Sequence, residues 1–97
     1  MKQGAFAIEV LGMLGNDYEA PQTIAGDLSL DLGRPVSEAE VRVALLELSL
    51  KGWAQAFRFD AASRQYVAIE AAEAANEQSA WFMATKKGMA AYESTAS

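Results

Sequence analysis

The chemistry open to this sequence rests on carboxylates, serine, lysine and arginine, because the chain contains neither histidine nor cysteine. That composition excludes disulfides, thiolate catalysis and histidine acid–base pairs, and it excludes most zinc sites. Asp27 and Asp31 are spaced to share one face of a helix, which is more typical of a solvated face than of a metal site. The sequence has no glycine-rich phosphate loop. We therefore predict a protein that is not an enzyme and that uses no cofactor and no metal.

The basic residues are the remaining candidates for binding, and their distribution matters because nucleic acids are polyanions. The chain has a net charge of −5. Residues 1–33 carry a net charge of −4, whereas residues 34–57 are neutral as a whole. A nucleic-acid surface is therefore expected in the second segment or beyond it.

Size and hydropathy indicate one globular domain, residues 1–97, with a single hydrophobic core. No apolar run approaches the roughly 20 residues that span a bilayer, and the N-terminus does not resemble a secretion signal. We expect a cytoplasmic protein that makes no contact with a membrane.

The segment from Ser37 to Trp53 predicts a helix with well-marked ends, and the other elements are arranged around it. Ser37 and Glu40 form a capping box, in which each side chain satisfies a backbone N–H of the first turn. Gly52 can adopt the left-handed conformation that ends a helix. One face carries apolar residues at helical spacing, namely Val41, Ala44, Leu45 and Leu48.

Helical periodicity precedes this segment, and an alternating pattern of period two follows it. The first helix has a wider apolar stripe than one contact needs, which indicates either a central core helix or contact with a second subunit. The predicted elements are helices at 5–14 and 22–32, strands at 55–59 and 64–70, a strand at 81–84 and a last helix from Thr85. The acidic segment 71–79 between the strands is either a loop or one or two exposed helical turns, and its composition favours a mobile connector.

Three short sequence motifs of the chain are informative about its fold when they are taken together. Residues 6–19 contain a helix followed by Tyr-Glu, residues 37–53 read Ser-x-x-x-Val-x-x-x-Leu-x-x-Leu-x-x-x-Gly-Trp, and residues 81–88 read Trp-Phe-Met-Ala-Thr-Lys-Lys-Gly. In this order they resemble winged helix-turn-helix transcriptional regulators of the PadR-like group and, less closely, the MarR-like group. Asp17 departs from the pattern, because the PadR-like group has glycine there.

The resemblance implies an α+β winged-helix fold, in which a three-helix core is followed by a β-hairpin wing and a C-terminal helix. The wing and the acidic connector would cover about residues 54–84. The resemblance also implies a dimeric repressor that places residues 37–50 in the major groove of double-stranded DNA. The expected DNA contacts are Ser37, Arg42, Arg58, Arg64 and Lys86, and the expected dimer contacts are Phe6, Val10, Met13, Met89 and Tyr92.

The charges on the central helix leave two interpretations of Arg42 open. Its guanidinium could read guanine in the major groove, or it could pair with Glu38 or Glu47 on the same helix. Glu38 and Glu40 favour the positive end of the helix dipole, yet they would repel a phosphate docked there. The large aromatic residues after this helix are predicted to lie in the core: Trp53, Phe57, Phe59, Trp81 and Phe82.

A second apolar stripe on the same helix supports a different function. Val43, Leu46 and Leu50 are off the core face, where a helix that faces water or DNA would not normally carry three large apolar groups. Either another part of the chain covers them, or this face binds a protein. The alternative hypothesis is therefore a winged-helix interaction module that no longer binds DNA.

Overall fold

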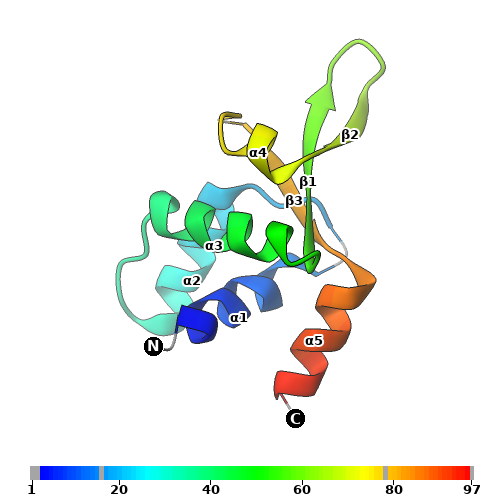
Figure 1. The fold of residues 1–97 in the computed structure, drawn as a ribbon. Coiled ribbons are helices and arrows are strands. Elements are labelled where there is room, and N and C mark those ends of the chain that lie inside the picture. Colours follow the sequence, from blue (N-terminus) through cyan, green and yellow to red (C-terminus); the bar gives the residue numbers. More distant parts are fainter. Residues whose placement is uncertain (1–2, 16, 78, 97) are drawn as a thin grey trace.

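A computed structural model describes residues 3–15, 17–77 and 79–96, and the remaining residues lie outside the description. The chain is an α+β structure in which a helical layer packs against one face of a small antiparallel sheet (Figure 1). The elements in order are α1 (Gln3–Leu14), α2 (Pro21–Leu32), α3 (Glu38–Leu50), β1 (Ala54–Asp60), β2 (Gln65–Ile69), α4 (Ala71–Ala74), β3 (Trp81–Ala84) and α5 (Lys86–Ala96).

The join between α2 and α3 is fixed by local chemistry that the sequence predicts. Gly33 adopts a left-handed conformation with φ of 68° and ends α2. The backbone N–H of Val36 donates to the Ser29 hydroxyl at 2.9 Å, which ties the connection back onto α2. Ser37 and Glu40 then form the predicted capping box at the start of α3. The two helices are therefore held at a defined angle by a short and well-bonded turn.

The first helix is central to the hydrophobic core of the single chain. α1 contacts α2, α3, β3 and α5, and Val10 has no exposed surface. The Tyr92 ring from α5 covers Gly12 so closely that a Cβ there would overlap it. The centre of the apolar stripe is therefore buried within one chain, whereas Phe6 and Met13 at its edges are only partly buried. This corrects the prediction for Val10, because a fully buried side chain has no surface to offer a second subunit.

The sheet has the strand order β2-β1-β3, and its register decides which residues share a face. Ala56 pairs with Ile69 on one side and with Phe82 on the other, and all three are buried against the helices. Because side chains alternate along a strand, Phe57, Phe59 and Tyr66 lie on the opposite face. The backbone of Glu19 pairs with Phe82, which closes the outer edge of β3.

The segment after the hairpin differs from the mobile connector that the sequence predicts. Residues 71–74 form one helical turn, and Ala74 and Ala80 are fully buried. This turn contacts both α3 and β1, and it lies between α3 and the hairpin in Figure 1. Small alanine side chains allow this close approach, which composition alone does not reveal. Gln78 of the predicted connector lies outside the described residues.

Among the helices of the described residues, each is too short or too polar to cross a lipid bilayer.

Candidate nucleic-acid interface

The outer face of α3 is acidic and apolar rather than basic. Val43 is 62% exposed and Leu50 is 78% exposed, whereas Leu46 is partly buried against the core. The same helix carries Glu38 and Glu40 in its first turn and Glu47 farther along. The second apolar stripe is thus covered at only one of its three positions. α3 lies at the surface and is accessible to a partner. Its exposed side chains, however, do not supply the positive charge that binding to phosphate requires.

Arg42 is the basic residue of α3, and its guanidinium is engaged within the fold. Nη2 donates to the backbone carbonyls of Ala74 at 3.1 Å and Glu77 at 3.0 Å. These bonds join α3 to the connector across more than 30 residues of sequence. Arg42 therefore fastens the connector onto α3, a role that the sequence did not suggest.

The hairpin supplies further exposed positive charge, beyond Arg34 and Lys51 at the two ends of α3. Arg58 lies on β1, and its Nη1 is 3.5 Å from Glu73 Oε2 in an ion pair that is about half exposed. Arg64 is exposed in the turn, with a left-handed φ of 58°. Asp60 accepts a hydrogen bond of 2.7 Å from the Ser63 hydroxyl, and this bond lowers the pKa of Asp60. A hairpin that projects from the body and carries arginine at its turn suits contact with a phosphate backbone.

The connector thus binds two of the five predicted DNA contacts. Its carbonyls accept from Arg42, and its Glu73 carboxylate pairs with Arg58. The acidic segment lies beside the surface where DNA would have to dock, so it competes with phosphate for those cations.

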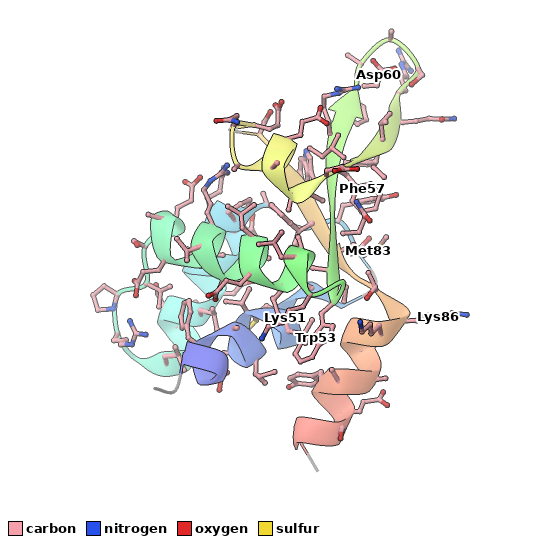
Figure 2. The ribbon with its side chains drawn as sticks, in the orientation of Figure 1. Lys51, Trp53, Phe57, Asp60, Met83 and Lys86 are labelled. Carbon is pink, nitrogen blue, oxygen red and sulfur yellow. The ribbon has the colours of Figure 1, made fainter. Side chains whose placement is uncertain are left out.

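Ser37 and Lys86 have different surroundings. The Ser37 hydroxyl accepts a hydrogen bond from the Glu40 backbone N–H at 3.1 Å, so it already serves as the N-terminal cap of α3. Lys86 is exposed and points away from the body at the start of α5 (Figure 2). These two predicted contacts lie at separate ends of the helical layer, and Lys86 is not close to the hairpin turn in the figure.

The Thr-x-x-Gly phrase before α5 is explained by packing. The Thr85 hydroxyl donates to the carbonyl of Gly52 at 2.7 Å and accepts from the Gly88 backbone N–H at 3.0 Å. A Cβ at Gly88 would overlap the carbonyl oxygen of Trp53. The phrase therefore docks the start of α5 onto the start of β1, which is a structural role.

The outer face of the sheet carries a group of aromatic residues that sequence reasoning assigned to the core. Only Phe82 of the five predicted core aromatics is fully buried, and Phe59 is 44% exposed. The reason is that the helices cover one face of the sheet and leave the other open. Tyr18 joins this group from the loop after α1, and its ring stacks on Tyr66 at 3.8 Å. The alternating pattern of β1 placed Phe57 and Phe59 together, but nothing in the sequence pointed to Tyr18.

Comparison with known proteins adds no further assignment. No family model, no curated protein and no solved structure matches this chain. Within the described ranges, no three acidic side chains come together in a group that could hold a metal ion.

Proposed function

We propose that this chain is a small winged helix-turn-helix DNA-binding regulator of the PadR-like kind. The observation that carries the proposal is the arrangement of α2, α3 and the β1–β2 hairpin. A short capped turn presents α3 at the surface of the helical layer, and the hairpin projects beside it (Figure 1). This is the geometry in which a helix enters the major groove while a hairpin follows the backbone.

The charges favour different roles in DNA binding for the hairpin and for α3. Arg58 and Arg64 on the hairpin would neutralise phosphates, whereas α3 would contribute mainly shape. In this proposal the protein acts as a homodimer, with Phe6, Met13 and Met89 as the contacts that the first and last helices could still offer. Sedimentation over a range of concentrations tests the dimer independently of DNA.

The decisive experiment is a titration of the full chain against random duplex DNA at low and at moderate salt. A regulator of this kind binds at low salt and weakens steeply as salt rises, because binding releases counterions. Absence of binding at low salt would overturn the DNA proposal. A single-stranded oligonucleotide of the same length serves as a control for non-specific attraction.

A second candidate function, a protein-interaction module, is supported by the exposed apolar residues of α3. Val43 lines a hollow of about 410 Å³ with Phe6 and Ala44, and charged residues complete the lining, namely Arg34, Glu40 and Glu47. Leu50 is exposed farther along the helix. Apolar groups in such a position are typical of helix-binding surfaces.

Serine substitutions separate this candidate from the regulator. Val43→Ser and Leu50→Ser should abolish self-association or partner binding while leaving the unfolding transition nearly unchanged. Leu30→Ser is the matched control, because Leu30 is 85% exposed but lies on α2. Unchanged association in both variants would count against the interaction module.

A further inference from the structure

A groove lies where β1 extends beyond the start of β3. β3 pairs with β1 only as far as Phe57, so β1 has no β3 partner at Arg58 and beyond. The notch that remains has a volume of about 500 Å³. Its lining comes from both hairpin strands, the connector and the first residue of β3, namely Arg58, Phe59, Tyr66, Glu77, Ser79 and Trp81.

Three aromatic rings form adjoining walls of this groove. The Tyr66 and Trp81 rings are 5.6 Å apart and nearly perpendicular, with an interplanar angle of 81°. The Phe59 and Tyr66 rings are 5.1 Å apart at 63°. Tyr18 stacks on Tyr66 at 11°, which supports that wall. Rings at steep mutual angles can surround a rounded group and contact it with several aromatic faces.

One acidic and one basic residue, Glu77 and Arg58, line the groove. The Glu77 carboxylate lines it, with Oε2 accepting from the Ser79 hydroxyl at 3.0 Å. The positive charge of Arg58 is matched by Glu73 at 3.5 Å. Carboxylates also flank Tyr18 on the far side of the aromatic group. Burial, followed by repulsion from Asp17 and Asp27, raises the pKa of Glu19.

The rim of the groove is held in place by the core helices. Arg42 donates to the backbone carbonyl of Glu77, so the connector is fastened at the residue that carries the carboxylate. A wall fixed before binding loses little entropy when a ligand arrives. The groove is therefore largely preformed.

We propose that this groove binds organic cations with an alkylated ammonium head, such as quaternary ammonium compounds. Aromatic faces carry negative electrostatic potential and attract a cation, and a quaternary ammonium leaves water readily because it has no N–H donors. Glu77 adds a formal charge of the right sign. Stacked bases of single-stranded nucleic acid would bring a phosphate toward Glu77, which a cationic ligand does not do. The site requires no DNA, so it stands or falls independently of the proposed regulator function.

The test uses the full chain with choline as the probe and 3,3-dimethylbutan-1-ol as its neutral isostere of the same shape. The two tryptophans give two indole N–H resonances, and Trp53→Phe assigns them. Choline should shift the Trp81 resonance in a saturable manner at millimolar concentration, while the Trp53 resonance remains in place. The neutral isostere should bind about three- to tenfold more weakly. Equal binding of the two compounds, or no saturable shift, would overturn the proposal.

Two variants locate the site. Glu77→Gln removes the charge but keeps the backbone carbonyl that Arg42 holds, and Phe59→Leu removes one exposed wall. Each should weaken choline binding at least threefold, with unchanged urea unfolding and unchanged dispersion of the amide spectrum. Glu9→Gln on α1 is the matched control for charge and should have no effect. If Glu77→Gln and Glu9→Gln reduce binding equally, the attraction is a general effect of net charge and the assigned site is wrong.

Discussion

The helix α3 and the β1–β2 hairpin lie on either side of the same connector, yet they present opposite surfaces. α3 has a net charge of −2 over residues 38–50, and its outer face exposes Val43 and Leu50. The hairpin has a net charge of +1 over residues 54–69, and Arg64 is exposed at its turn. A DNA-binding helix-turn-helix usually reads bases with the helix and holds phosphates with both elements.

In this chain the helix with the shape to enter a DNA groove and the exposed positive charge therefore lie on different elements. The helix with the shape for a groove carries carboxylates, whereas exposed arginines lie on the hairpin. Binding to DNA would therefore depend mainly on the hairpin and show little base preference. The following substitutions test that contrast.

The largest effect is expected for Arg42→Ala. The change leaves the carbonyls of Ala74 and Glu77 without their charged donor, so the free energy of unfolding should fall by about 2–3 kcal/mol in urea titrations. Arg34→Ala is the control, because Arg34 is exposed and its ion pair with Glu40 is long at 4.0 Å; it should cost less than about 0.5 kcal/mol. If Arg42→Ala left stability unchanged but abolished duplex binding, Arg42 would be a base contact.

Next in size is the joint substitution of Arg58 and Arg64 by alanine. We expect duplex affinity to fall about tenfold or more, and the slope of log affinity against log salt to decrease by about two. Isotherms at several salt concentrations measure both quantities. Lys87→Ala on α5 is the control, and an equal loss there would show that the hairpin has no special part in binding.

The opposite change is expected on α3. Glu38→Gln together with Glu47→Gln removes two negative charges from the outer face and should raise duplex affinity about two- to fivefold at low salt. Fluorescence anisotropy with a labelled duplex is a suitable measurement. A loss of affinity would mean that these glutamates accept hydrogen bonds from cytosine. In that case α3 would recognise the base sequence.

A smaller effect is expected for Arg64→Gly, which tests the stability of the hairpin turn separately from its charge. Arg64 has a left-handed backbone, which costs a residue with a Cβ more than it costs glycine. After allowance for the greater freedom of glycine in the unfolded chain, Arg64→Gly should raise stability by about 0.5 kcal/mol while weakening duplex binding. Thermal melts show the first effect. A loss of stability would indicate that the Arg64 side chain itself supports the turn.

The smallest expected effect concerns Glu19, which belongs to neither region. Its pKa is raised above the ordinary 4.5 by burial and by Asp17 and Asp27. The folded protein therefore holds this proton more tightly than the unfolded chain, and stability falls as pH rises through the interval between 4.5 and the raised value. Glu19→Gln should melt slightly higher than the parent protein at pH 7, and the difference should vanish well below pH 4.5. Duplex binding should depend on it much less than on Arg58.

Local patterns predicted most of the elements, because their signals lie within a few residues. Ser37 and Glu40 mark the start of α3, Gly33 ends α2, and alternation identifies the hairpin. The sequence favours a mobile connector over the helical turn α4, since a single alanine-rich turn has no periodicity of its own.

The candidate surfaces were less predictable because they depend on contacts between distant parts of the chain. The two carbonyls that accept from Arg42 are more than 30 residues away, so these bonds could not be predicted from neighbours on α3. The strand pattern grouped Phe57 and Phe59 but could not tell which face the helices cover. Tyr18 reaches Tyr66 from a loop that carries no strand or helix signal.

Fastening Arg42 and Arg58 to one short segment has a thermodynamic consequence. Detachment of that segment would release a guanidinium on α3 and another on β1 in a single event, so the two are linked through the segment. Their mutational free energies should consequently not add, and a double-mutant cycle between Arg42 and Arg58 should give a non-zero coupling energy.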